Sequence, residues 1–324
     1  MGRQGAQKSQ LAFKRSLTVE TLEPFFFNGA YIAYGLATAM YLLYAFKKKE
    51  PLSKAAFALV LAGAALHLAD FATRAYIGRE IYLLKHYVPW SNWFESFSLF
   101  AFVVACTYIA VQRIYSLPIL GAFVLPLQWL LISFSMTYPL FRGWEDLRGA
   151  SQMWTAMMES RAIPHLMPAL QSIWMSIHVP IMFTSYSAFG VAFAIGIVYI
   201  LQERQIKSKN PGELSENLPA LEPLDTMIYR LVSWGFPLLT LGIILGARWA
   251  YDAWGRYWGW DAKETWALIT WFTYAIYLHM RLVMSWRGRK TVILSIAGFG
   301  VVLFTYIGVN YLSALHGFLS GKGS

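Results

Sequence analysis

The chain has 324 residues, of which 57% are hydrophobic and 14% are charged, and its mean hydropathy is +0.44. A soluble protein of this length needs far more charge on its surface, so the composition excludes an ordinary soluble globular domain. The formal net charge of +10 could suggest nucleic acid, but Lys and Arg lie between apolar runs, as expected for the flanks of membrane helices. We therefore predict an all-α polytopic membrane protein with no nucleic-acid partner.

Apolar runs of about twenty residues recur along the chain, and each can cross a bilayer as a helix that satisfies its own backbone hydrogen bonds. Residues 1–24 carry four basic residues without a long apolar core, which predicts a tail and not a cleaved signal peptide. A single transmembrane domain is expected over 25–324. Its helices, about eight in number, are predicted near 25–46, 54–73, 93–111, 117–136, 178–201, 227–249, 264–282 and 291–312.

The distribution of Lys and Arg predicts the orientation of this bundle. The loops that are short and rich in Lys and Arg are expected on the inner side, at 47–54, 112–116, 202–226 and 281–290. The longer, more aromatic loops are expected on the outer side, at 74–92, 137–167 and 250–263. Both termini then lie outside, and only the basic residues of the tail oppose this arrangement.

The densest aromatic cluster is W-G-R-Y-W-G-W-D-A-K-E at 254–264, in the outward-facing loop 250–263. Trp254, Trp258 and Trp260 form a broad, stiff surface that suits a large planar ligand. The alternative is an aromatic belt at the rim of the bilayer, where tryptophans also collect. Close spacing between two long apolar helices, with glycines among the rings, favours the ligand.

The polar residues of this loop have simpler explanations as well. Asp261 stands three residues before Glu264 at the start of an apolar run, which predicts a helix-capping box as its first role. Arg248, Arg256 and Lys263 could pair with carboxylate groups of a bound ligand. Interfacial snorkelling explains each of the three equally well.

Two of the six histidines are expected at the depth of the tryptophan-rich loop. His178 is predicted to open the fifth helix, and His316 follows the eighth. Two neutral imidazoles on opposite sides of a flat ring system can fill both axial positions of a haem iron. The pair and the aromatic loop thus predict a haem sandwich. A buried hydrogen-bonding role stays open for each histidine.

His279 is predicted much deeper in the membrane. It follows Asp261 by 18 residues, which at 1.5 Å per residue is roughly 27 Å along a helix. With no partner at its own depth, it either makes a structural hydrogen bond or ligates an iron whose second ligand belongs to another polypeptide. We favour the second, because ligands at two depths give haem an entry station and an outer working station. His67, His86 and His165 receive no ligand role.

The motifs around these histidines resemble the CcsA (ResC) family of system II cytochrome c biogenesis. W-G-R-Y-W-G-W-D-A-K-E is similar to the family's tryptophan-rich WWD signature, and the resemblance covers most of the chain. It extends to segments at 86–96, 168–179, 277–281 and 306–316. Ala262 stands where the family usually has Pro, and Gly317-Phe318 stands where it tends to have Ser-Tyr.

The resemblance implies a haem-transporting and haem-presenting subunit of a cytochrome c synthase (haem lyase). His178 and His316 match the pair that ligates haem b at the WWD loop, and His279 matches the histidine that shares a haem with a CcsB (ResB) partner, without which the chain is not catalytic. The substrate is an apocytochrome c with a C-x-x-C-H segment. Since Cys106 is the only cysteine, thiol reduction is left to a thioredoxin-like protein. The implied location is a bacterial cytoplasmic membrane or a plastid thylakoid membrane, with the loop on the periplasmic or lumenal side.

Two other functions stay open at this point. A CcmC-type haem exporter would have the same loop and would deliver haem to a chaperone. A membrane b-type cytochrome would carry electrons, but it needs two complete histidine pairs in one chain, and His279 has no obvious mate.

Overall fold

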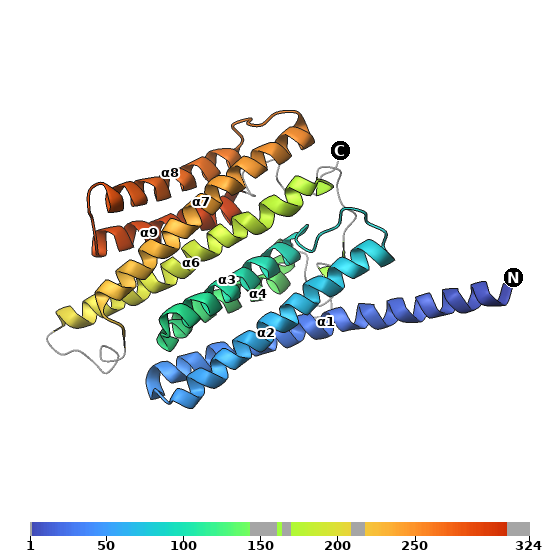
Figure 1. The fold of residues 1–324 in the computed structure, drawn as a ribbon, viewed down its shortest axis with the longest axis horizontal. Helices are drawn as coiled ribbons and strands as arrows, with labels where there is room; N and C mark the ends of the chain where they lie inside the picture. Colours follow the sequence, from blue (N-terminus) through green and yellow to red (C-terminus); the bar gives the residue numbers. More distant parts are fainter. Residues whose placement is uncertain (1, 143–160, 164–169, 209–217, 310–324) are drawn as a thin grey trace.

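The computed structural model describes residues 2–142, 161–163, 170–208 and 218–309, and within these segments its regular structure is helical (Figure 1). This confirms the all-α prediction. The long helices are α1 (Gly2–Lys47), α2 (Glu50–Tyr76), α3 (Trp93–Tyr115), α4 (Gly121–Arg142), α6 (Ile173–Lys207), α7 (Leu221–Trp254), α8 (Ala262–Leu282) and α9 (Arg289–Leu303). Short π-helical segments follow α2 (Ile77–Ile81, η1) and α9 (Phe304–Gly308, η5), and a 3-10 turn precedes α4 (Pro118–Leu120, η2).

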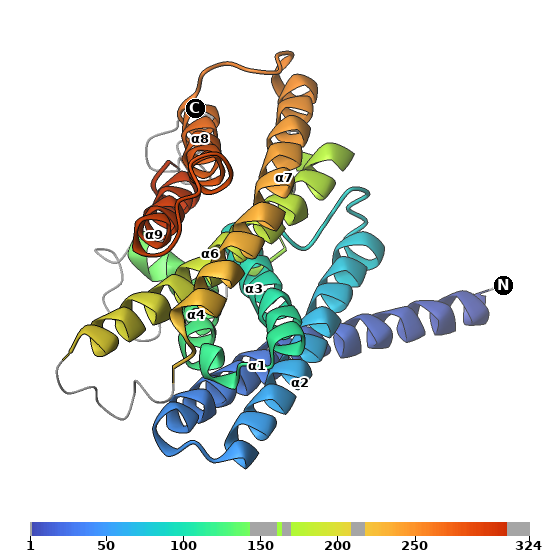
Figure 2. The same cartoon turned by 60° about the vertical axis from the view of Figure 1, so that its left-hand side comes forward.

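Helix α6 lies at the centre of the bundle and packs against α3, α4, α7 and α9. The α1–α2 pair covers α3 and α4 on one side, and α8 packs on α7 and α9 on the other (Figure 2). The N-terminal part of α1 projects beyond the bundle in both views. One continuous apolar core joins these helices, including the stacked rings of Phe189 on α6 and Tyr274 on α8, 3.6 Å apart.

Capping and turn residues mark where the helices begin and end. Asn92 caps α3, because its Oδ1 accepts a hydrogen bond from the Glu95 backbone N–H at 2.8 Å. Ser116 ends α3 in the left-handed conformation, and Pro118 follows. Gly255 ends α7 with φ +74°, a conformation that glycine adopts without the steric cost of a Cβ.

Seven of the described helices are long and apolar enough to cross a membrane, which supports a multi-pass membrane protein. Helix α8 is absent from these seven, although it occupies the predicted span 264–282 almost residue for residue. Its threonines and tyrosines, with His279 and Arg281 near its end, make it less apolar. Its passage through the membrane stays a prediction.

Several predicted helix boundaries are wrong. Helix α1 begins at Gly2, so the first helix starts well before the predicted residue 25 and includes residues 2–24. Helix α6 begins at Ile173, because the Ser172 hydroxyl accepts a hydrogen bond from the Trp174 N–H and caps it one turn earlier than expected. His178 therefore lies in the second turn and does not open the helix. Helix α7 continues to Trp254, which shortens the predicted loop 250–263 to 255–261.

The loops segregate to the two ends of the bundle as predicted. Residues from the predicted outer loops 74–92 and 250–263 line one shared cavity. At the other end, Asp225 joins two predicted inner loops, since its carboxylate pairs with Arg281 at 2.7 Å and accepts the Gly288 N–H at 3.1 Å. Which end faces outward stays a prediction.

Candidate functional site

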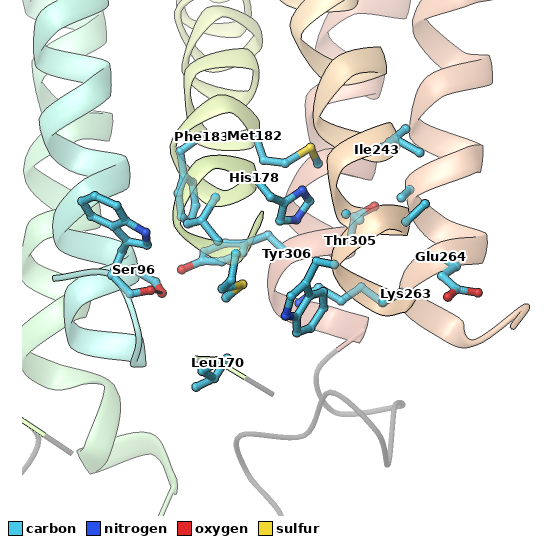
Figure 3. Close-up of a pocket in the computed structure, with 18 of the residues that line it drawn as sticks. Ser96, Leu170, His178, Met182, Phe183, Ile243, Lys263, Glu264, Thr305 and Tyr306 are labelled. Atoms are coloured by element: carbon cyan, nitrogen blue, oxygen red, sulfur yellow. Dashed lines mark hydrogen bonds between the residues drawn. The ribbon is translucent and has the colours of Figure 1, made fainter. Parts of the chain in front are cut away.

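An open cavity lies between α3, α6, α7 and η5, and the loop 255–261 borders it (Figure 3). Its empty space, mouth included, is about 1480 Å³. Aromatic and aliphatic side chains make up most of its lining, and among the described lining residues the charged groups are Lys263 and Glu264.

His178 projects from α6 into this cavity (Figure 3). Its Nδ1 lies 2.7 Å from the backbone oxygen of Gly242 on α7. A carbonyl oxygen can only accept, so Nδ1 must carry the proton and donate it. The neutral ring then keeps a lone pair on Nε2, which is the arrangement of histidines that ligate metals. The Nε2 of His178 is thus available to accept a bond from a ligand in the cavity.

Two glycines on α7 make this orientation possible. Gly246 lies directly against the imidazole, and a Cβ at this position would approach the His178 Cε1 to 2.7 Å and Nδ1 to 3.0 Å. At Gly242, a Cβ would meet the sulfur of Met182, one turn above His178, at 2.3 Å. The G-x-x-x-G spacing therefore lets α6 and α7 approach so closely that a ring nitrogen on one helix reaches the backbone of the other.

The tryptophan-rich loop supplies one wall of the cavity. Trp254, Trp258 and Tyr257 line it, and the Trp258 indole N–H is buried without a hydrogen-bond partner in the described part of the chain. Trp260 points elsewhere: it is 69% exposed, adopts φ +56° and is absent from the lining. Trp254 and Trp258 thus have the placement predicted for ligand contact, and a role for Trp260 stays a prediction.

The capping box predicted at the start of α8 is present. The Asp261 Oδ1 accepts the Glu264 N–H at 2.8 Å, and the Glu264 Oε2 accepts the Asp261 N–H at 3.3 Å. The same Oε2 accepts the Gly259 N–H at 2.6 Å. Glu264 therefore anchors the loop as well as the helix. Asp261 therefore helps to hold the start of α8 beside the cavity, and its direct contact with a ligand stays a prediction.

The opposite wall comes from the start of α3 and the segment before it. Trp90, Trp93 and Ser96 line the cavity there. Glu95, between the last two, is fully buried and accepts hydrogen bonds from the Arg74 guanidinium at 2.7 Å and the Tyr87 hydroxyl at 2.5 Å. Glu95 is therefore a structural hydrogen-bonding residue. Its partners show that it fixes the segment carrying both tryptophans.

The three cations predicted near the ligand occupy different environments. The Arg248 guanidinium pairs with Asp252 and lies over the rings of Trp174 and Tyr251, 5.3 and 5.4 Å from their centroids. Arg256 is exposed and folds over Gly259, where a Cβ would meet its guanidinium at 2.5 Å. Neither lines the cavity.

Lys263 is the cation that lines the cavity. It precedes the predicted span 264–282, and burial lowers the pKa of its ammonium to about 8, although Asp261 acts in the opposite direction. The Arg248 and Arg256 assignments stay predictions.

Of the other two predicted iron ligands, the structure describes His279, which is absent from the cavity lining. His279 is exposed near the far end of α8, beside exposed Phe272 and Ile276 on the same face. The helix between Asp261 and His279 is continuous, so the predicted separation along α8 holds. His316 and His165 lie outside the described residues. His67 is buried, with Nε2 2.7 Å from the Ser98 hydroxyl.

Sequence reasoning missed several lining residues. Trp90, Trp93 and Tyr306 belong to segments that carried the resemblance, but their chemistry gave no separate signal. The G-x-x-x-G spacing of Gly242 and Gly246 was a readable signal for close helix approach. The π-helix η5, which presents Thr305 and Tyr306 to the cavity, had none. Such segments often occur at functional sites.

Comparisons with known proteins agree with this architecture. The family model described as Cytochrome C assembly protein matches residues 90–316. Cytochrome c biogenesis protein CcsA of Prochlorococcus marinus (strain MIT 9301) is 37% identical over 255 residues, covering 72% of this chain and 77% of the relative. The CcsA of Guillardia theta is 36% identical over 249 residues, covering the same shares. The CcsA of Synechococcus elongatus is 32% identical over 297 residues, covering 79% and 86%.

A solved structure, that of Cytochrome c Heme Lyase CcmF, is similar with a TM-score of 0.60 and 19% identity. The match covers 89% of this chain and 47% of that chain, and at this identity it shows a shared fold alone. The helical bundle, its aromatic cavity lined by His178, and the sequence matches lead to one conclusion: the chain belongs to the CcsA family of cytochrome c biogenesis proteins.

Proposed function

We propose that this chain binds haem b in the cavity through the Nε2 of His178 and presents it for covalent attachment to an apocytochrome c. The observation that carries the proposal is the Nδ1–H hydrogen bond to Gly242, which leaves Nε2 free to ligate within an open aromatic cavity. Trp254 and Trp258 on one side and Trp90 and Trp93 on the other supply flat surfaces of the kind that a porphyrin contacts.

His316 is the proposed second axial ligand. The described chain ends at Val309, three residues after Tyr306, which lines the cavity. Seven further residues can span at most roughly 25 Å, so His316 is within chain reach of this site. His279, at the far end of α8, is the proposed ligand of a second haem position that a CcsB (ResB) subunit completes. This separation supports transport from one side of the membrane to the other.

The chemistry needs positioning more than acid–base catalysis. Each cysteine thiol of the C-x-x-C-H segment adds its S–H across one vinyl C=C of haem, so two thioethers form without net oxidation or reduction. Holding two vinyl groups against two thiols is a proximity effect. The aromatic walls exclude water and side reactions during this step. The thiols themselves must arrive reduced, which we assign to a thioredoxin-like protein.

The test is co-expression of the full chain with its partner subunit and an apocytochrome bearing C-x-x-C-H, followed by haem staining of the denatured product. Covalent product with wild type, and its loss in His178→Ala, is the expected result. Haem binding without covalent product under the same conditions would favour the haem exporter. Absence of bound haem in the purified wild-type complex would overturn the proposal.

A further inference from the structure

Lys263 lies in an unusual electrostatic position. It is the second residue of α8, and a cation in the first turn of a helix opposes the helix dipole, whose positive end is there. It projects into the cavity below His178, whereas the Glu264 carboxylate points away toward its own hydrogen bonds (Figure 3). Lys263 and His178 are close enough to interact electrostatically.

The cavity offers this ammonium no compensating anion in the described structure. The other charged lining residue is Glu264, and its carboxylate already accepts hydrogen bonds from the backbone N–H groups of Gly259 and Asp261. Lys263 forms no ion pair with any described carboxylate at salt-bridge distance, and the nearest electrostatic influence is Asp261, which caps α8. Partly burying a cation without a partner is costly, so the arrangement favours a ligand that brings negative charge.

A second donor belongs to a residue of the cavity wall. The Trp258 indole N–H is buried without a hydrogen-bond partner among the described residues. Buried donors are almost always satisfied in folded proteins, so an unsatisfied N–H within the cavity wall is a candidate contact for an acceptor on the ligand. An ammonium and an indole N–H together form a site for a carboxylate.

We infer that Lys263, assisted by the Trp258 N–H, binds a propionate carboxylate of the porphyrin and fixes its rotation about the His178–iron axis. This inference rests on the proposed haem site and names the group that orients the ligand there. Arg248 is committed to Asp252 and to two aromatic rings, and Arg256 lies outside the lining, so Lys263 takes the role considered for all three.

The experiment compares two ligands on the purified full chain in lipid nanodiscs. Ferric haem and its dimethyl ester differ only in the two carboxylates, and the affinity ratio between them measures carboxylate recognition. Hydrogen bonds to charged groups contribute roughly 1.5–3 kcal/mol, so wild type should prefer haem by about 10- to 150-fold. Lys263→Met should abolish most of this preference, Lys263→Arg should retain it, and Trp258→Phe should lower it several-fold. Lys290→Met is the matched control, because Lys290 is the second residue of α9 and is absent from the cavity lining; this change should leave the preference for haem unaltered.

Each other outcome has a distinct meaning. If wild type binds neither ligand, the proposed haem site fails as a whole. If wild type binds both equally, or if Lys263→Met keeps the preference, the haem site stands and the Lys263 assignment is overturned. Loss of the preference in Arg248→Met or Arg256→Met, with Lys263→Met unchanged, would return the role to those arginines. His178→Ala should weaken both ligands alike and leave the ratio intact.

Discussion

Gly246→Ala tests whether α7 holds His178 in its ligating orientation. The new methyl group would lie 2.7 Å from the His178 Cε1. Ordinary van der Waals contact begins near 3.4 Å, so the imidazole must retreat by about 0.7 Å. That shift also pulls Nδ1 away from the Gly242 oxygen, now 2.7 Å distant. Overpacking of this kind costs about 1–3 kcal/mol.

The cost should appear in ligand binding, because the ring can escape the clash only by leaving its position. A loss of 1–3 kcal/mol corresponds to haem binding weakened about 5- to 150-fold. The assay is haem titration of the purified chain, with absorption spectra of the bound state. Thermal unfolding and size-exclusion profiles establish that the variant is folded.

Gly300→Ala is the matched control. It lies on α9, and a Cβ there meets nothing within 4 Å, so haem affinity should equal that of wild type. If Gly246→Ala binds haem with wild-type affinity and an unchanged spectrum, the close approach of α7 does not position a ligand, and the reasoning about His178 fails.

Three further predictions concern the supports of the site and its distant histidine. Glu264→Ala removes the capping box and the tie to the loop, so stability should fall by about 1–2 kcal/mol and limited proteolysis within 255–261 should speed up, while Glu264→Gln keeps an acceptor and should be milder. Glu95→Ala removes one of the two carboxylates that pair with the buried Arg74 guanidinium and leaves Glu23 as the other, so the midpoint of thermal unfolding should drop by the equivalent of about 1–3 kcal/mol; an unchanged midpoint would contradict the role of this ion pair. His279→Ala should leave haem at the cavity of the isolated chain unaffected and lower the haem content of the complex with the partner subunit, measured as haem per complex.

The sequence was sufficient for the fold class because each apolar run specifies its own helix. Boundaries failed where a local cap outweighed hydropathy. Ser172 caps α6, which begins five residues ahead of the predicted start at 178, and residues 2–24 continue α1 although they contain no long apolar run. The capping box at Asp261 was predictable because both of its partners lie within four residues.

The site was only partly predictable, because its geometry depends on contacts between helices. The residue types alone, histidine and tryptophan, were enough to single out His178 and the segment 254–260 as candidates. The support of His178 by Gly242 and Gly246 comes from a segment more than sixty residues away. The sequence likewise could not rank Arg248, Arg256 and Lys263 as ligand contacts, since only the packed structure shows which of these cations lines the cavity.

The most direct test of the account is the electronic spectrum of ferric haem bound to wild type and to His178→Ala. With two axial imidazoles the wild-type iron should be low-spin, and removing one ligand should convert it to high-spin and weaken binding. External imidazole, which can enter the space left by the side chain, should restore the low-spin spectrum. A His178→Ala variant that keeps both the wild-type spectrum and the wild-type affinity would contradict the assignment of His178 as an iron ligand.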